Sequence, residues 1–400
     1  MSVNKKVPEI RFKGFSEAWE NKKIGEILTE IKRPIELMDN ESYQLVTVKR
    51  RNEGVVPRAV LKGENILVKN YFSIKAGDYL ISKRQVVHGA NGIVPDNLDG
   101  AVVSNEYLVI TDSDDITARY WTISSIIPKM HKLFFISSYG VDIEKLVFDV
   151  ADWKNRTITI PKIAEQKNIT SYFQKLDNLI NQHQRKHDKL SNIKNSMLEK
   201  MFPKQGETMP EIRFKGFTGE WKTSKLSELA LFNPKAELPE SFKYVDLESV
   251  KGTSLIGYKV ESRDSAPSRA QRLAQKGDVF YQTVRPYQKN NYLFDSVEND
   301  YVFSTGYAQL RPYFNGNFLL NVFQRDSFIK NVLYNCTGTS YPAINASTLA
   351  TLEVSYPKSE AEQTQIGNYF QKLDVLINQH QQQITKLNNI KQACLSKMFV

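Results

Sequence analysis

The 400-residue sequence has little of the chemistry that catalytic and metal-binding sites require. Its two cysteines, Cys336 and Cys394, and its five histidines match no metal-ligand spacing and suggest no catalytic triad. The motifs GxxxxGK[ST], GxGxxG and HExxH are missing, as is the Asn/Asp-Pro-Pro-Tyr/Phe tetrapeptide of amino-group methyltransferases. The sequence therefore argues against an enzyme, and we expect no metal and no cofactor in this chain.

Long apolar runs are missing too. No stretch approaches the ~20 apolar residues needed to cross a bilayer, and the first 15 residues alternate polar and apolar side chains, unlike a secretory signal. Because cysteine is so scarce, we expect a protein of the reducing cytoplasm that has no membrane partner.

Positive charge is in excess, but it is not spread evenly. The net charge of +10 suggests a polyanionic partner. Residues 1–160 nevertheless carry 23 Lys/Arg against 21 Asp/Glu, and residues 209–355 carry 17 against 15. If these blocks bind nucleic acid, they must do so through local patches.

One large duplication organises the chain. The octapeptide Pro-Glu-Ile-Arg-Phe-Lys-Gly-Phe occurs at residues 8–15 and again at 210–217, and residues 173–202 match residues 370–399 at 20 of 30 positions. A spacing of about 200 residues is far above that of repeat arrays. Each copy is thus a variable block followed by a near-constant segment. The expected domains are a first variable block at 1–160, a helix at 161–205, a second variable block at 206–355 and a helix at 356–400.

The near-constant segments are expected to be long helices that pair with each other. Their apolar positions recur in alternating steps of four and three, which is typical of a coiled coil. A compact block separates the two segments, so an antiparallel pairing needs no return of the chain along the helix. The alternative is that each helix packs locally against its own block. The predicted seam consists of Ile169, Phe173, Leu176, Ile180, His183, Leu190, Ile366, Phe370, Leu373, Ile377, His380, Ile384 and Leu387. A lone seam histidine more often fixes register than binds a metal.

The variable blocks mix short strands with turns, which predicts an α+β protein with two similar globular domains joined by the helix pair. In both blocks a Gly-Asp turn (Gly77-Asp78, Gly277-Asp278) leads into a strand, and a run of Arg, Lys, Gln and Asn follows. Such side chains suit base edges and phosphates, although any one of them alone is more often a solvated loop residue. The candidate DNA-binding residues are Lys49, Arg50, Arg51, Lys83, Arg84, Gln85, Asn91, Arg285, Tyr287, Gln288, Lys289, Asn290, Thr339 and Tyr341.

A proline-led helix with Glu-Gln near its start follows each block. The segments are Pro161-Lys-Ile-Ala-Glu-Gln-Lys-Asn-Ile169 and Pro357-Lys-Ser-Glu-Ala-Glu-Gln-Thr-Gln-Ile366. With the octapeptide and its trailing Trp19 or Trp221, this arrangement resembles the specificity subunit of type I restriction–modification systems over nearly the whole chain. Block one departs from the resemblance at Gly140–Lys145, where block two has Gly-Thr-x-x-Pro.

The resemblance implies a non-catalytic subunit that reads a bipartite site in double-stranded DNA, one half per block, with the helix pair setting the gap. It also implies two methyltransferase subunits that use S-adenosylmethionine and grip the helices, and two restriction subunits, the motor–nucleases, which use ATP and Mg²⁺. Three alternatives stay open. They are a related system whose methyltransferase and nuclease are fused, an enzyme with duplicated catalytic domains, and a coiled-coil protein that displays two heads for a ligand other than DNA.

Overall fold

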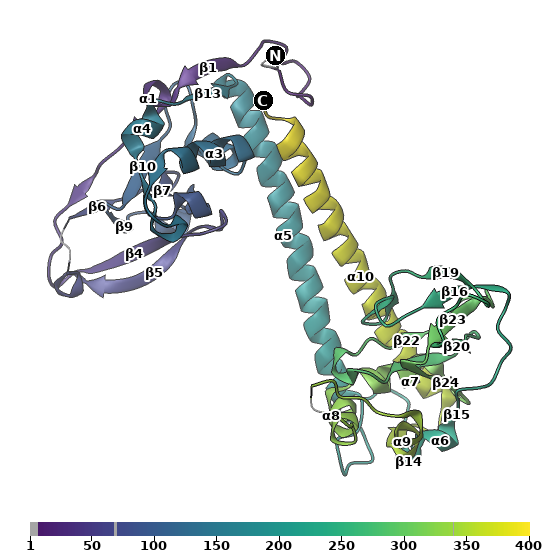
Figure 1. Cartoon of the computed structure of the whole chain (residues 1–400). Helices are drawn as coiled ribbons and strands as arrows, with labels where there is room; N and C mark the ends of the chain where they lie inside the picture. Colours follow the sequence, from purple (N-terminus) through teal and green to yellow (C-terminus); the bar gives the residue numbers. More distant parts are fainter. Residues whose placement is uncertain (1–6, 68–69, 339) are drawn as a thin grey trace. The chain divides into compact units, whose positions relative to one another are not determined.

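The computed structural model describes residues 7–67, 70–338 and 340–400. The chain divides into two compact units, and each contains part of both long helices. Unit 1 holds the chain up to Gln182 together with Ile384–Val400, and unit 2 holds His183–Gln383. Figure 1 shows the chain coloured along the sequence and labels many of its helices and strands.

Unit 1 contains two main sheets. Their strand orders are β2-β10-β7-β8 and β3-β6-β9-β4-β5, and two-stranded pairs form between β1 and β13 and between β11 and β12. The strands are β1 (Glu20–Lys23), β2 (Thr29–Glu30), β3 (Pro34–Ile35), β4 (Ser42–Lys49), β5 (Gly54–Lys62), β6 (Tyr71–Ser73), β7 (Tyr79–Ser82), β8 (Asn91–Ile93), β9 (Val102–Ser104), β10 (Tyr107–Thr111), β11 (Ser138–Tyr139), β12 (Val147–Phe148) and β13 (Thr157–Ile160). The short helices are α1 (Ile24–Ile27), α2 (Ala118–Ser124), α3 (Pro128–Ile136), α4 (Val150–Lys154), η1 (Gly63–Asn65), η2 (Val86–His88), η3 (Asp96–Leu98) and η4 (Ile143–Lys145).

Unit 2 repeats this plan. Its sheets run β15-β24-β21-β22 and β19-β16-β23-β20, with pairs β14-β25 and β17-β18. One parallel contact occurs in the second sheet of each unit, β4 with β9 and β16 with β23. The strands are β14 (Lys222–Lys225), β15 (Ala230–Phe232), β16 (Ser241–Val245), β17 (Val250–Lys251), β18 (Ser254–Leu255), β19 (Lys259–Ser262), β20 (Ala270–Leu273), β21 (Val279–Gln282), β22 (Tyr292–Leu293), β23 (Tyr301–Ser304), β24 (Tyr307–Pro312) and β25 (Glu353–Tyr356). The short helices are α6 (Leu226–Leu229), α7 (Gly316–Gln324), α8 (Asp326–Tyr334), α9 (Ala346–Thr351) and η5 (Pro286–Gln288). The predicted α+β class and the duplication are confirmed.

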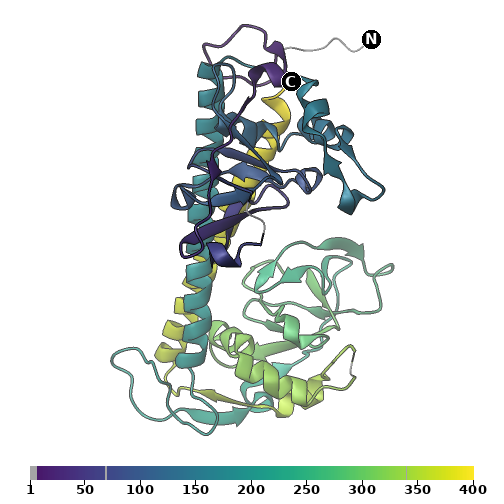
Figure 2. The same cartoon turned by 90° about the vertical axis from the view of Figure 1, so that its left-hand side faces the viewer.

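The two near-constant segments form the helices α5 (Ile163–Lys200) and α10 (Glu360–Lys397), each 38 residues long. In unit 1 the start of α5 lies beside the end of α10, where the rings of Phe173 and Phe399 are 6.2 Å apart. In unit 2 the end of α5 lies beside the start of α10, and the rings of Phe202 and Phe370 are 6.3 Å apart. The helices are therefore antiparallel, as predicted (Figures 1 and 2). They also contact each other, which excludes helices that pack only against their own blocks.

Burial along the helices follows the predicted seam. Its buried members are Ile169, Phe173, Leu176, Ile366, Phe370, Leu373 and Ile384, and its half-buried members are Ile180, His183, Leu190, Ile377, His380 and Leu387. The apolar core of unit 1 combines Trp19, Trp121 and Trp153 with Leu395 near the end of α10 and Met398 just after it. Met201 and Phe202, just after α5, belong in the same way to the core of unit 2. Each unit thus completes its core with residues from the end of the other copy's near-constant segment.

A buried ion pair ties each octapeptide to the start of a helix. Arg11 donates two hydrogen bonds of 2.7 Å to Glu165, which is 1% exposed. Arg213 binds Glu362 in the same way at 2.7 and 2.8 Å. The hydrogen bonds that the arginines donate to these carboxylates raise the pKa of both arginines. The octapeptide backbone also reaches the end of the other helix, because Ile10 donates to the carbonyl of Lys397.

The two seam histidines meet in unit 2. The Nδ1 atoms of His183 and His380 are 2.9 Å apart, so one ring donates and the other accepts. Burial and then the charges of His183, Lys186 and His187 lower the pKa of His380. The pair is a polar contact between the two helices. The described part of the chain contains no cluster of three or more metal-ligating side chains. None of its helices is both long and apolar enough to cross a membrane.

We predict that Arg213→Ala lowers the free energy of unfolding of unit 2 by about 3–5 kcal/mol, because it leaves the buried Glu362 carboxylate without a partner. Arg11→Ala should do the same in unit 1. Urea unfolding of the purified chain measures both. The matched controls, Lys13→Ala and Lys215→Ala, change exposed residues of the same octapeptides and should alter stability by less than about 0.5 kcal/mol. Equal effects of arginine and lysine variants would contradict this assignment.

Acid should weaken the helix pair through the histidines. The pKa of His380 lies below its ordinary 6.5 in the folded chain, so the unfolded chain binds more protons just below that pH, and stability falls as the pH drops from 6.5 towards the lowered value. The paired substitution His183→Asn with His380→Asn, which keeps a polar pair without titration, should flatten this part of the curve. Urea midpoints between pH 8 and 5 test it. Identical pH slopes in both proteins would refute the role of the pair.

Candidate nucleic-acid interface

Three segments far apart in the sequence meet in unit 1. They are the tip of the β4–β5 hairpin (50–53), the turn through η2 (83–91) and the loop through η4 (140–146). The hairpin tip is bound to the turn by its backbone, since Arg51 donates to the carbonyl of His88 (2.7 Å) and Asn52 to that of Gly89 (2.8 Å). The ring of His88 lies 3.3 Å from the carbonyl of Ile143 in the third segment. We call these three segments the unit 1 loop cluster.

Several predicted side chains bind one another inside this cluster. Arg50 donates through Nε to Gln85 Oε1 (2.8 Å) and through Nη2 to Glu144 Oε2 (2.7 Å). Asn91 is buried and donates to Asn52 Oδ1 at 3.1 Å. Gln85 and Asn91 thus have partners within the protein, whereas half of the Arg50 side chain is exposed.

The remaining candidates of unit 1 lie around the cluster. Arg84 is exposed and pairs with Glu106 at 2.8 Å, and this hydrogen bond and charge raise the pKa of Arg84. Lys83 donates to the carbonyl of Asn105 at 2.7 Å. Lys49 lies 3.8 Å from Glu53, and Arg51 is exposed at the hairpin tip. Carboxylates thus accompany several of the cations on this surface.

Unit 2 builds the same cluster from the β17–β18 tip (252–253), the turn through η5 (283–291) and a third segment, residues 337–338 with 340–343. Asn290 Oδ1 accepts from the backbone N–H of Gly252 (2.8 Å), and the N–H of Arg285 donates to the carbonyl of Pro342 (2.8 Å). Val284 also forms a β-bridge with Ala343. We call these segments the unit 2 loop cluster.

Some of the predicted residues of unit 2 are hydrogen-bonded within the protein, and two predicted tyrosines are exposed. Lys289 binds the carbonyl of Gln324 (2.9 Å) and Asp326 (2.5 Å), and Gln288 accepts from Gln282 (2.8 Å). Tyr287 and Tyr341 are 50% and 64% exposed. The guanidinium carbon of Arg285 lies over the ring of Tyr341, 4.6 Å from its centroid. Thr339 lies outside the described residues.

Left-handed backbone marks both clusters. Among the described residues other than glycine, five have positive φ, and four of these lie in the clusters: Arg51, Asn52, Arg285 and Lys289, with φ between 54° and 60°. Such conformations cost on the order of 1–3 kcal/mol and gather at ligand sites. This feature points to the same surface as the side chains do.

The candidates predicted from the sequence did not include Asn52, His88 and Glu144, which the fold brings into the unit 1 loop cluster. The sequence did contain one indication that the turn of unit 1 corresponds to that of unit 2. The Gly-Asp pairs at 77–78 and 277–278 are 200 residues apart. The same offset relates Asn91 to Asn291 and η2 to η5. Nothing in the sequence places Glu144 beside Arg50, 94 residues earlier.

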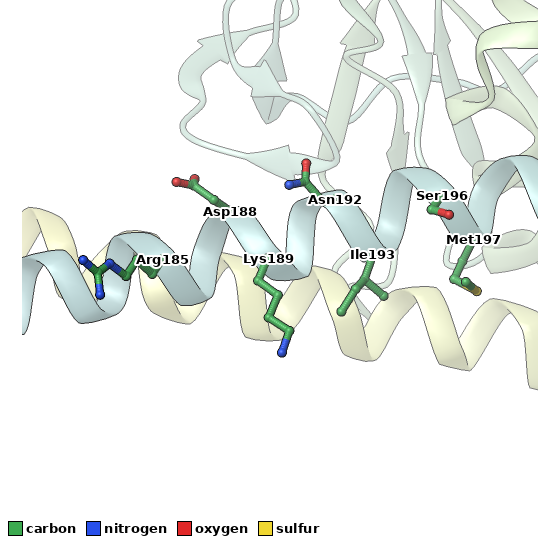
Figure 3. Close-up of a pocket in the computed structure, with 7 residues that line it drawn as sticks. All are labelled: Arg185, Asp188, Lys189, Asn192, Ile193, Ser196 and Met197. Atoms are coloured by element: carbon green, nitrogen blue, oxygen red, sulfur yellow. The ribbon is translucent and has the colours of Figure 1, made fainter. Parts of the chain in front are cut away.

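A separate shallow pocket lies along α5 in unit 2 (Figure 3). All its lining residues come from that helix, and the charged or polar ones lie beside the half-buried apolar residues Ile193 and Met197. They are Arg185, Asp188, Lys189, Asn192, Ile193, Ser196 and Met197. The set contains neither a nucleophile–base pair nor a metal-ligand cluster, which suits a contact surface better than catalysis.

Comparison with known proteins gives one family. The family model described as type I restriction modification DNA specificity domain matches residues 16–192 and again 218–389. The HindI type I restriction enzyme specificity subunit of Haemophilus influenzae is 26% identical over 168 residues, which cover 39% of this chain and 35% of that subunit. The match thus spans about a third of that relative's length.

Two solved structures are similar over nearly the full chain. The type I restriction–modification S subunit from M. genitalium aligns with a TM-score of 0.58 at 14% identity, over 98% of this chain and 99% of that one. The HsdS subunit from Thermoanaerobacter tengcongensis aligns with a TM-score of 0.44 at 17% identity, over 95% and 96%. Since the family model covers both halves of the sequence, the chain belongs to the type I restriction modification DNA specificity family and is a specificity subunit that carries the family's domain twice.

Proposed function

We propose that this chain is a non-catalytic adaptor that reads a bipartite site in double-stranded DNA, one half with each loop cluster. One observation carries the proposal: both units bring the same three segments together, but with different polar side chains. A shared scaffold with divergent contact residues suits two readers of one kind of ligand that differs in detail.

The chemistry of the clusters supports DNA as that ligand. Arginine, glutamine and asparagine present donors and acceptors in fixed pairs that match base edges, while lysine and arginine bind phosphates. Each variable block is close to neutral, so sequence-independent attraction should be modest. The surface should therefore depend on base contacts for tight binding.

The helix pair supports a defined gap between the half-sites. Each helix is one uninterrupted element of 38 residues whose two parts belong to different units. At about 1.5 Å per residue, such a helix is about 57 Å long, more than one ~34–36 Å turn of DNA. On this proposal, the helix pair sets the number of unread base pairs between the half-sites.

Methylation and cleavage are assigned to partner subunits. We propose two methyltransferase subunits that bind S-adenosylmethionine and two restriction subunits that use ATP and Mg²⁺, with no cofactor held by this chain. The α5 surface of Figure 3 offers exposed groups of both signs for docking. In protein–protein interfaces, charged and amide side chains supply the hydrogen bonds between the partners.

The first test is a map of adenine methylation. Cells that carry the chain and its methyltransferase should show one bipartite motif with a fixed gap, and deletion of the chain should remove that motif alone. Single-molecule sequencing measures this. A matched control replaces residues 206–355 with the block of another specificity subunit, which should change one half of the motif and keep the other. A methylation map that is unchanged by deletion would overturn the proposal.

The docking surface can be tested without DNA. Arg185→Glu with Lys189→Glu should reduce co-purification with the methyltransferase at least about tenfold, because reversing two charges in an interface places like charges opposite each other at a cost of several kcal/mol. The control, Lys276→Glu with Lys330→Glu, reverses two charges on the globular part of unit 2. Thermal unfolding confirms that both variants fold. Unchanged co-purification of the α5 variant would place the methyltransferase elsewhere.

A further inference from the structure

Arg50 is held by one edge of its guanidinium. Its Nε atom donates a hydrogen bond to Gln85, and its Nη2 atom donates one to Glu144. These two acceptors come from different segments of the unit 1 loop cluster. A guanidinium has five N–H donors, so three are left. Two of these, one on Nη1 and one on Nη2, form the fork at the end of the side chain. The side chain is 50% exposed, which leaves room for a ligand to approach these donors.

Arg285 is held by its face. Its guanidinium carbon lies over the Tyr341 ring, and within the described part of the chain the guanidinium makes no hydrogen bond and no ion pair. A cation–π contact attracts the charge but uses none of the N–H donors as hydrogen bonds to a polar partner. The backbone is fixed as well, with φ 54° and ψ 55° and its N–H bound to Pro342.

The two arginines come from different segments. Gln85 and Arg285 occupy equivalent positions in the turns, so unit 2 presents its arginine from the turn and unit 1 from the hairpin tip. In both clusters a second segment orients the guanidinium: Glu144 on the loop through η4 for Arg50, and Tyr341 on the segment 340–343 for Arg285.

A fixed guanidinium fork with two parallel N–H donors fits a pair of acceptors. Guanine presents two in the major groove, O6 and N7, whereas adenine presents one acceptor and one donor. Phosphate also offers two acceptors to such a fork, but attraction to phosphate depends on the net positive charge of the surface. Glu144 offsets the charge of Arg50 while orienting it, which weakens attraction to phosphate and keeps the hydrogen-bond geometry. This favours a base over phosphate.

We propose that Arg50 and Arg285 each read a guanine, one in each half of the target. Glu144 and Gln85 position Arg50, and Tyr341 positions Arg285. This inference rests on the proposed function and names its substrate more closely. It assigns Glu144 a role in base discrimination although a carboxylate repels DNA in general.

The test measures methylation rates of the complete complex on DNA in which each position of both half-sites is varied in turn. Arg285→Lys keeps the charge and loses the fork, so preference for guanine at one position of one half should fall about 10- to 100-fold, with the other half unchanged. Arg50→Lys should give the same result in the other half.

Matched variants separate positioning from folding. Tyr341→Leu should lower the same guanine preference several-fold, whereas Tyr341→Phe, which keeps the ring, should retain it. Glu144→Ala should lower the preference in the half read by Arg50. Glu144→Gln keeps an acceptor for Arg50 and should retain the preference while binding all DNA more tightly at low salt.

Three results would overturn the inference while leaving the proposed function intact. The first is that Arg285→Lys and Arg50→Lys slow methylation equally on all sequences, which indicates phosphate contacts. The second is that the relaxed position is a base pair without guanine. The third is that Tyr341→Leu or Glu144→Ala leaves the preference unchanged. A wild-type complex in which this chain imposes no bipartite motif would overturn the proposed function and the inference together.

Discussion

The buried ion pair between an octapeptide arginine and a helix glutamate is the contact on which each unit depends. Glu165 and Glu362 lie in the protein interior, where an unpaired carboxylate is strongly unfavourable. Their arginine partners bring the octapeptide to the start of one helix, and the octapeptide backbone bonds to the end of the other, through Lys397 in unit 1 and Lys200 in unit 2. The octapeptide therefore contacts the near-constant segments, whose sequences also repeat. This explains why its eight letters are repeated without change while the blocks that follow diverge.

Two ion pairs between the helices also favour their antiparallel direction. Lys391 binds Asp177 in unit 1 at 2.6 Å, and Lys194 binds Asp374 in unit 2 at 2.5 Å. Within the aligned repeats, Lys194 corresponds to Lys391 and Asp177 to Asp374. A parallel pair in the same register would place equivalent residues, and hence like charges, opposite each other. Antiparallel pairing joins opposite charges twice, so the duplicated segment is complementary to itself in one direction only.

Features that depend on local periodicity could be predicted, and features that depend on distant contacts could not. The alternation of steps along Ile169, Phe173, Leu176 and Ile180 is enough to predict a helix with one buried face. The connection through a compact block predicts its antiparallel partner. The pairing of His183 with His380 follows only once that register is known.

The candidate interface shows where prediction from the sequence ends. Composition and position in the repeat led to Arg285 and Tyr341, but the sequence did not indicate that one lies over the other. Lys289 has the same polar character as its neighbours, yet it is bonded to Asp326. A polar loop residue that holds its own fold and one that faces a ligand have the same signature in a single sequence. They differ only in partners that other segments supply.

The distribution of carboxylates bears on how such a surface achieves specificity. In unit 1, Glu106 and Glu144 lie beside Arg84 and Arg50, so the positive charge available to phosphates is reduced. If affinity came mainly from phosphate contacts, these carboxylates would weaken binding to target and non-target DNA alike. Where base contacts supply much of the free energy, the same repulsion lowers binding to every wrong sequence, and only the target offsets it with directional hydrogen bonds. On the proposed function, the near-neutral charge of each block is thus a source of discrimination, because weak general attraction lets a few oriented side chains decide which DNA is bound.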